Sequence, residues 1–479
     1  MNTYFIKIIS GVLLLSVFFL SCRKENFLTQ GGSISFSSDT LTFDTVFTAQ
    51  GSATRSIKIY NNQNQPIRIS SIKLQGGSAS PFKLNVDGAP GNAATDIEIA
   101  PSDSLYVFAT VTIDPTSADA PFIVEDQLIA NLNGSTFSVP VIAFGQNANY
   151  IFDSVLTTQT WTKDKPYVII NNALVDSGEV LSIDPGCRIY LHANSRLFVD
   201  GTLVANGTKN DSIVFQGDRI DRAYFDYLDL PGEWGGLYFT RNSTGNVLRH
   251  TTIKNGGSST RLGESLVQAA AIQVDKKAQA GAPLQLLLDR VTIINSIGFG
   301  ILSFGGEVKA QNCLIANCGS QNVAAIQGAD FTFENSTLAT FGSSYLSHSE
   351  NSVLGLLNYL DTSQTGFIPG DLNATFTNCI VYGTLENEVV ILKKGSAQHQ
   401  VTFTNCLLKV KTADLPNHVG MNSVLLNTDP EFEDEEKWNF RLKTSSPCID
   451  YGIVLPGFSV DRDDNVRTGN YDLGCYEAP

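Results

Sequence analysis

Carboxylates and aromatic rings alternate in one irregular stretch of the chain, residues 218–233. Carboxylate oxygens accept hydrogen bonds from sugar hydroxyls, and aromatic rings stack on the apolar faces of sugars. The stretch therefore predicts a sugar-binding loop, although a solvated loop that only closes a turn explains the same composition. The residues predicted here as ligand contacts are Asp218, Asp221, Tyr224 and Tyr227, with Trp234 just beyond the stretch.

Two further irregular stretches carry side chains that could bind a ligand. Residues 341–372 include Tyr345, His348 and Tyr359, which we predict as further ligand contacts. Residues 256–266 include Arg261 and Glu264. Long loops on a rigid scaffold are common binding sites, but a solvated loop is again the alternative for each stretch.

A third kind of chemistry is suggested by Asp461, Asp463 and Asn465, whose D-x-D-x-N spacing is that of a calcium-binding loop. The distal bidentate Glu is missing, and Asp464 stands near the usual Gly position. These departures favour a structural turn in which Arg467 pairs with an Asp. Calcium is therefore the one metal that we keep as a candidate, and we expect no other cofactor.

No catalytic constellation stands out elsewhere. The five His residues are scattered, and the sequence has no C-x-x-C pair, no H-x-x-x-H spacing and no Ser/His/Asp motif. The net charge of −15 argues against a nucleic-acid partner, since phosphate binding needs clustered Lys and Arg. The same charge weakens, without excluding, a polyanionic sugar as ligand.

The element that must position these loops is a repeated hexamer, of which residues 376–381 are the clearest copy. Its central positions recur at spacings of 40, 22, 23, 43 and 27 residues, so the long spacings are about twice the short ones. One short apolar strand in each unit of roughly 20–25 residues predicts a solenoid, because each unit can bury its apolar face only against its neighbours. The central positions are residues 250, 290, 312, 335, 378 and 405.

The hexamer predicts a bend in the chain. Phe376 and Cys379 can both face the core only if the chain bends at Asn378, and Asn tolerates the left-handed conformation that such a bend needs. The equivalent Asn side chains should form a ladder, and the residues that follow them should form a buried column. The ladder is Asn312, Asn335, Asn378 and Asn405, and the column is Cys313, Ser336, Cys379 and Cys406. We interpret these Cys residues as packing groups rather than metal ligands.

Residues 33–146 follow a different pattern. Apolar residues alternate with polar ones over short runs, and turn residues separate the runs about every ten residues, which predicts a β-sandwich. The segment contains no Cys, so no disulfide joins its sheets. The sequence therefore predicts an all-β protein in which a small sandwich precedes the solenoid.

The N-terminus resembles a bacterial lipoprotein signal. Lys7 precedes an apolar run, residues 8–20, that ends in Ser21-Cys22. The resemblance implies that residues 1–22 are a signal peptide, that Cys22 carries the lipid, and that residues 23–32 are a tether. An ordinary secretory signal is the alternative. We expect an exported protein that is lipid-anchored at the bacterial outer membrane or cell surface.

Three longer segments also resemble known families. Residues 42–47, 57–61 and 81–82 resemble abnormal-spindle-type immunoglobulin-like domains, which implies such a domain over residues 33–146. Residues 180–215 and 231–239 resemble the right-handed parallel β-helices of the pectin-lyase-like fold, which we expect over residues 150–445.

The C-terminus resembles the choice-of-anchor Q type of bacterial surface proteins, in the runs Trp438–Leu442, Ser445–Gly452 and Tyr471–Glu477. We expect residues 446–479 to form a C-terminal cap. The resemblance implies that Cys448 and Cys475 lie on strands that come together, and because the protein is expected to be exported, we predict a disulfide between them.

Three functions fit these expectations. The first is a membrane-anchored, non-catalytic surface protein that binds a glycan or a protein. The second is a polysaccharide lyase or glycoside hydrolase of the pectin-lyase-like fold, although the carboxylate sets typical of those hydrolases are missing. The third is a structural or adhesive rod.

Overall fold

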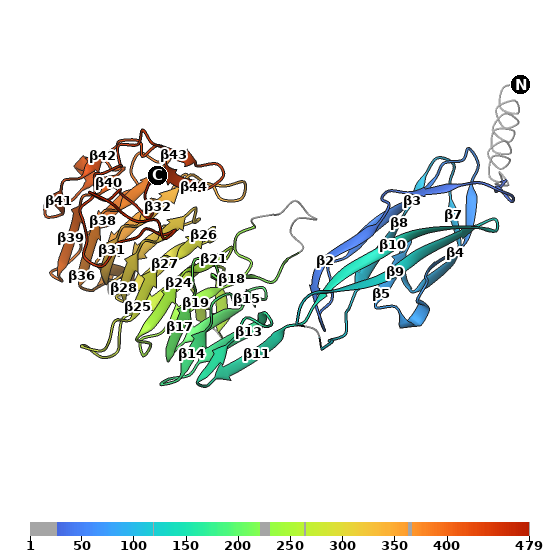
Figure 1. Cartoon of the computed structure of the whole chain (residues 1–479), viewed down its shortest axis with the longest axis horizontal. Coiled ribbons are helices and arrows are strands. Elements are labelled where there is room, and N and C mark those ends of the chain that lie inside the picture. Colours follow the sequence, from blue (N-terminus) through green and yellow to red (C-terminus); the bar gives the residue numbers. More distant parts are fainter. Residues whose placement is uncertain (1–25, 118, 221–229, 263–264, 363–365, 479) are drawn as a thin grey trace, which may run out of the picture. The chain divides into compact units, whose positions relative to one another are not determined.

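The computed structural model describes residues 26–117, 119–220, 230–262, 265–362 and 366–478. The chain divides into two compact units, residues Met1–Asn147 and Ala148–Pro479. Each unit is built almost entirely of β-strands (Figure 1), and the helical elements among the described residues are the short 3-10 turns Gly77–Ala79 and Thr412–Asp414.

The first unit is a sandwich of two five-stranded sheets. One sheet has the order β1-β3-β8-β5-β6 and the other has the order β2-β10-β9-β4-β7, and every pairing except the parallel one between β2 and β10 is antiparallel. The alternating apolar residues of both sheets form the core between them, as in Ile57 and Ile59 of β3 in one sheet and Val139 and Val141 of β10 in the other. The strands are β1 (Ile34–Phe36), β2 (Leu41–Phe47), β3 (Arg55–Asn61), β4 (Ile67–Leu74), β5 (Phe82–Val86), β6 (Ala89–Gly91), β7 (Ala93–Ile99), β8 (Ser104–Val111), β9 (Phe122–Leu132) and β10 (Ser135–Gln146).

The second unit is a parallel β-helix, in which successive strands visit three parallel sheets in turn. Sheet A contains β12 (Gln159–Trp161), β14 (Val180–Ile183), β17 (Thr202–Asn206), β20 (Asn246–Arg249), β25 (Leu286–Asp289), β28 (Glu307–Gln311), β31 (Ala329–Glu334), β36 (Leu372–Thr377), β39 (His399–Thr404) and β41 (Gly420–Asn422). Sheet B contains β15 (Arg188–Leu191), β18 (Ile213–Gly217), β21 (Thr251–Lys254), β26 (Thr292–Ile294), β29 (Leu314–Ala316), β32 (Thr337–Thr340), β37 (Ile380–Gly383), β40 (Leu407–Leu408) and β42 (Leu425–Leu426). Sheet C contains β16 (Arg196–Val199), β19 (Gly236–Phe239), β24 (Ala270–Asp275), β27 (Phe299–Phe304), β30 (Val323–Ala325), β33 (Leu354–Leu357) and β38 (Val389–Leu392).

Two long strands open the solenoid, and three hairpins depart from it. The opening strand β11 (Asn149–Leu156) pairs with β13 (Tyr167–Val175), which in turn pairs with both β15 and β16 and so contributes to sheets B and C. The hairpins are β22 (Thr260–Leu262) with β23 (Ser265–Val267), β34 (Tyr359–Thr362) with β35 (Gly366–Pro369), and β43 (Phe432–Asp434) with β44 (Asn439–Leu442).

The predicted bend between sheets A and B is confirmed. All the repeat residues adopt a left-handed backbone, with φ between 41° and 55°. They are His250, Arg290, Asn312, Asn335, Asn378 and Asn405. The predicted amide ladder is only partly formed: Asn378 Nδ2 donates to Asn335 Oδ1 at 2.9 Å, but Asn405 Nδ2 donates instead to the carbonyl of Tyr451 at 2.8 Å.

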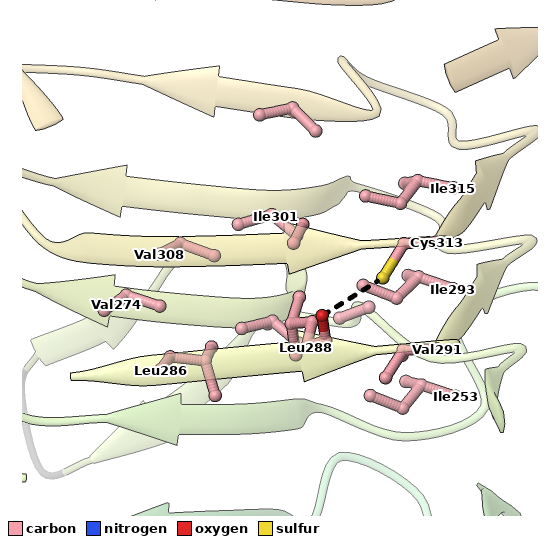
Figure 2. Close-up of a cluster of buried hydrophobic side chains, with 14 of the residues drawn as sticks. Ile253, Val274, Leu286, Leu288, Val291, Ile293, Ile301, Val308, Cys313 and Ile315 are labelled. Carbon is pink, nitrogen blue, oxygen red and sulfur yellow. Dashed lines mark hydrogen bonds between the residues drawn. The ribbon is translucent and has the colours of Figure 1, made fainter. Parts of the chain in front are cut away.

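The predicted columns inside the bend are confirmed as packing. Phe333, Phe376 and Phe403 lie in register, and their stacked rings are 5.1 and 5.0 Å apart. The position after the bend residue holds buried Ser and Cys side chains, which can also accept hydrogen bonds between coils. For example, the amide of Cys313 donates to Ser336 Oγ at 3.1 Å. Figure 2 shows the same stacking nearer the middle of the solenoid, where Ile253, Ile293 and Ile315 form one column.

The C-terminal segment does not cap the end of the solenoid. Residues 429–478, which we call the strap, run back along the A–B bend. After Tyr451 contacts the coil of Asn405, Ile453 exchanges hydrogen bonds with Asn378, and the carbonyl of Asp461 then accepts from Arg290 Nε at 3.2 Å. The strap also covers the outer surface of sheet B with an apolar cluster of its own. Its members include Phe432, Phe440, Leu442, Leu473 and Tyr476 from the strap and Leu314, Ala339, Ile380 and Leu407 from sheet B.

Candidate functional site

The three irregular stretches singled out in the sequence share one corner of the solenoid. The first joins β18 to β19, the second joins β21 to β24, and the third, through residue 353, joins β32 to β33. Each of these connections leads from sheet B to sheet C, so all three loops border the same edge of sheet C. The other B-to-C connections are short, as between β26 and β27.

Sheet C presents alternate side chains of each strand outward. Strand residues alternate, so Leu237, Ile301 and Leu354 enter the core while their successors in the sequence point away from it. One outward row begins with aromatic and polar residues at the first coils and continues with small or apolar residues at the later ones. In register, it is Phe198, Tyr238, Gln273, Leu302, Ala324, Gly355 and Val390.

A groove of about 400 Å³ lies over the apolar end of this row. Small residues, Ala324 and Gly355, leave room for it between larger neighbours. Its apolar lining comes from sheet C and its polar lining from the B–C corner. The apolar residues are Phe299, Ile326, Leu357 and Val390, and the polar residues are Gln321, Glu350, Ser352 and Asn387.

The polar side of the groove is held by a buried, hydrogen-bonded pair, His348 and Glu388. His348 Nε2 lies 2.9 and 3.0 Å from the two carboxylate oxygens of Glu388, and their side chains are 3% and 0% exposed. Glu388 also accepts hydrogen bonds from the amides of Val353 (3.1 Å) and Leu385 (2.7 Å). This carboxylate therefore ties the loop that carries Glu350 and Ser352 to the turn that carries Asn387.

At the polar end of the row, Tyr238 and Asp275 form a close pair. The Tyr238 hydroxyl donates to Asp275 Oδ2 at 2.5 Å, and burial together with this bond raises the pKa of Tyr238 above its usual range. Arg196 is buried beside the sheet edge, where its guanidinium donates to the carbonyls of Ser258 and Gln268. Burial lowers the pKa of Arg196 to about 10, so it remains charged at neutral pH. The Tyr238 hydroxyl stays protonated, which makes it a poor general base.

The structure takes three predicted ligand contacts out of reach. Trp234 is fully buried and donates from Nε1 to the carbonyl of Lys254 at 2.9 Å. Tyr359 is buried beneath the ammonium of Lys394, which lies 4.1 Å from its ring centroid. The His348 side chain is buried against Glu388, so it cannot reach a ligand. We correct these predictions: each side chain is a packing or anchoring group.

The other predicted contacts have mixed outcomes. Tyr345 is 40% exposed in the loop between β32 and β33. Asp218 lies 2.7 Å from the exposed His192, with which it forms an ion pair. Asp221, Tyr224 and Tyr227 lie outside the described residues, as does the lipidation residue Cys22. The groove residues of sheet C were missed by the sequence prediction because they are apolar or small and carry no motif.

A second Asn ladder was also missed, at the B–C corner. Asn255, Asn295 and Asn317 have φ of 58°, 58° and 51°, and Asn295 Nδ2 donates to Asn255 Oδ1 at 2.9 Å. Each follows a bend residue of the A–B corner by five positions, and this fixed offset is the signal that could have revealed it.

The predicted disulfide is not formed, because Cys448 and Cys475 are both free, buried thiols. Their segments do meet, since the amide of Leu473 donates to the carbonyl of Cys448 at 3.0 Å. The side chains have different partners, however. The amide of Cys475 donates to Thr337 Oγ1 of sheet B and that of Cys448 donates to Ser446 Oγ, and each thiol lies beside the same hydroxyl as its own amide.

The candidate calcium loop forms a structural turn. Asp461 is fully buried and accepts the amides of Asp463 and Asn465 on Oδ1, and Asn465 Nδ2 and the Glu477 amide on Oδ2, at 2.8–3.0 Å. Within the described parts of the chain, no group of three or more His, Cys, Asp or Glu side chains is placed to hold a metal. The expected partner of Arg467 was wrong: it pairs with Glu477 at 2.9 Å rather than with an Asp.

No protein-family model matches the chain, and no curated protein matches it. Among solved structures it is similar to the A-module of the mannuronan C-5 epimerase AlgE4 of Azotobacter vinelandii, with 11% identity, a TM-score of 0.25, and coverage of 60% of this chain and 82% of that one. It is also similar to a PapD-like domain of human CEP192, with 8% identity, a TM-score of 0.17, and coverage of 26% and 92%. A family 123 glycoside hydrolase from Clostridium perfringens has 9% identity, a TM-score of 0.17 and 25% coverage, and the chain spans 30% of its length. Likenesses at these TM-scores carry no argument about function.

Proposed function

We propose that this protein is an exported, lipid-anchored surface protein that binds a glycan chain in the sheet C groove and does not cleave it. The observation that carries the proposal is the groove itself, whose floor is small and apolar and whose one side is polar. Sugar rings have the matching character, with apolar C–H faces and hydroxyls at their edges.

The polar groups along the groove suit hydroxyl recognition. Amide, hydroxyl and carboxylate groups supply both donors and acceptors, as sugar hydroxyls require. The groove is lined by β27, β30, β33 and β38, adjacent strands whose spacing of about 4.8 Å gives it a length of roughly 14 Å. A short run of sugar rings therefore fits along the solenoid axis.

Two observations support binding without turnover. Glycoside hydrolysis uses a pair of carboxyl groups, and Glu350 is the one carboxylate among the described residues that line the groove. Elimination chemistry needs a base, and none of the described residues that line the groove is Lys, Arg, His or Tyr.

The lipid anchor in this proposal rests on the apolar run before Cys22. No helix in the described portion of the chain is long and apolar enough to cross a membrane. Growth of an expressing bacterium with labelled palmitate tests the anchor. The wild type should incorporate label and Cys22→Ser should not; label retained by the variant would contradict the lipidation of Cys22.

Glycan binding is tested by calorimetric titration of the full-length protein, purified in detergent, with a panel of oligosaccharides. Gly355→Phe should fill the groove and weaken binding by about tenfold or more, roughly 1.4 kcal/mol. A Cβ at this position would meet only the flexible Gln321 side chain, 3.3 Å away at Cγ, so the fold should tolerate the change.

The matched control is Thr375→Phe, which places the same ring on the exposed side of sheet A in the next strand, β36. Its affinity should equal that of the wild type. Equal loss in both variants would contradict the groove as the binding site, and release of shortened or ultraviolet-absorbing products would contradict the non-catalytic part of the proposal.

A further inference from the structure

We infer that the groove selects non-acidic glycans and rejects uronate-bearing or sulfated ones, with Glu350 as the specificity-determining residue. This inference rests on the proposed function and names the class of glycan that the same site takes.

The charge of the groove lining carries the inference. Of the ten residues that line it, Glu350 alone is charged, and none of these described residues is Lys, Arg or His. Its side chain is exposed, and its carboxylate has neither a hydrogen bond nor an ion pair within the described structure. A bound glycan therefore meets one uncompensated negative charge and no positive one.

Basic side chains of the adjoining turns do not offset this charge. Lys394 pairs with Asp361 at 2.6 Å and Lys411 pairs with Glu386 at 2.5 Å, so each is neutralised by a carboxylate of its own. Lys409 lies over the ring of Tyr382 and donates to the carbonyl of Gly383. Lys393 is exposed and is not among the residues that line the groove.

The backbone that carries Glu350 is held beside the groove. Its loop is anchored two residues earlier by the buried pair of His348 with Glu388, and three residues later by the bond from the Val353 amide to the same carboxylate. The backbone of Glu350 therefore stays at the groove when an anionic sugar approaches. Two like charges in close contact repel each other, and the repulsion is several times stronger near a protein surface than in bulk water.

Neutral and acidic sugars interact differently with a carboxylate in the binding site. A neutral sugar hydroxyl donates a hydrogen bond to a carboxylate, which is a favourable charge-assisted contact. A uronate or sulfate offers only acceptors to the same carboxylate, so it adds repulsion and loses the bond. The overall charge of −15 works in the same direction at longer range.

The test compares two oligosaccharides of equal length and linkage, one neutral and one with uronate units, by titration against the full-length protein in detergent. The wild type should bind the neutral oligosaccharide at least about tenfold more tightly. In Glu350→Gln, the ratio of uronate affinity to neutral affinity should rise by about tenfold, because the amide keeps an acceptor but loses the charge.

Salt gives a second measurement. Raising the salt concentration should increase the uronate affinity of the wild type, because the Debye length falls to about 3 Å at 1 M, and should change that of Glu350→Gln much less. The matched control is Glu436→Gln, which removes the same charge from the strap, on an exposed residue away from sheet C, and should leave the affinity ratio unchanged.

The possible results distinguish a failure of this inference from a failure of the proposed function on which it rests. A wild type that binds both oligosaccharides equally, or prefers the uronate, overturns the inference while glycan binding stands. An unchanged ratio in Glu350→Gln also overturns it. A wild type that binds neither oligosaccharide, or binds them with no loss in Gly355→Phe, overturns the proposed function and the inference together.

Discussion

The outer surfaces of sheets B and C are built alike but are covered differently. Both present apolar side chains outward over the later coils, Leu314 and Ile380 on sheet B and Ile326 and Leu357 on sheet C. On sheet B the strap buries them beneath Phe432 and Phe440. On sheet C no described segment does so over the groove. Outward apolar side chains thus add to the buried core where the strap covers them, and they line an open groove where no described segment does.

The largest expected effect is the loss of the ion pair that holds the strap. Arg467 is fully buried, pairs with Glu477 and donates to the carbonyl of Gly474 and to Asn312 Oδ1. Arg467→Ala leaves Glu477 uncompensated and should lower the unfolding free energy by about 3–5 kcal/mol. Denaturant titration of the wild type and the variant measures this loss of unfolding free energy. Arg441→Ala, which removes a half-exposed partner of Asp463, is the control and should cost about 1 kcal/mol or less.

The second prediction compares the two surfaces directly. Leu314→Ala should cost about 2–4 kcal/mol because it opens a cavity under the strap, where Leu314 is buried. Leu357→Ala, on the partly exposed floor of sheet C, should cost about 1 kcal/mol, since solvent already reaches the site. Equal costs, measured by the same titration, would show that the two surfaces are not differently covered.

A smaller and more local effect is expected at the groove. His348→Ala removes the partner of the buried Glu388 and should loosen the loop that carries Glu350. Hydrogen exchange at the amide of Val353, which donates to Glu388, should accelerate by about tenfold or more, while exchange in sheet B should not change. Glycan affinity should fall with it. Faster exchange throughout the solenoid would mean that the pair supports the whole fold instead.

The smallest expected effect is on cysteine reactivity, which tests how well the strap shields the outer surface of sheet B. Burial raises the pKa of Cys448 to about 12 and that of Cys475 to about 11, so both are protonated at pH 8 and should resist alkylation in the native protein. Both should react after unfolding without a reductant, and an unreactive pair would mean a disulfide. Arg467→Ala should speed their labelling, whereas Cys379 in the solenoid core should stay unlabelled in the native state of both proteins.

Local features of the solenoid were predictable from the sequence, and shared positions between coils were not. The bend at Asn378 was predictable because Asn tolerates a left-handed backbone better than other non-Gly residues. The bend also explains why Phe376 and Cys379 both face the core. All three loops lie at the B–C corner because each follows a strand of sheet B. The repeated hexamer does not reveal which sheet a given loop follows, so this shared position could not be predicted. The groove depends on small residues such as Gly355, which carry no chemical motif.

The errors have related causes. Trp234 and His348 were judged by residue type, and burial decided otherwise. The disulfide was inferred from two segments that do meet, but the meeting of backbones does not fix where two side chains point. Asp461 has the spacing of a metal ligand, yet its oxygens are filled by four N–H groups of its own turn and of Glu477.

The backward course of the strap has a consequence for how the solenoid folds and unfolds. In a simple solenoid each coil contacts only its neighbours, so coils can fray one at a time from an end. Here the strap joins coils across long stretches of chain, as between Arg290 and Asp461, which are 171 residues apart. Such distant contacts close late and slow folding, but once made they couple the coils. We expect the coils from His250 to Asn405 to unfold as one cooperative block, and those before it to be free to open separately.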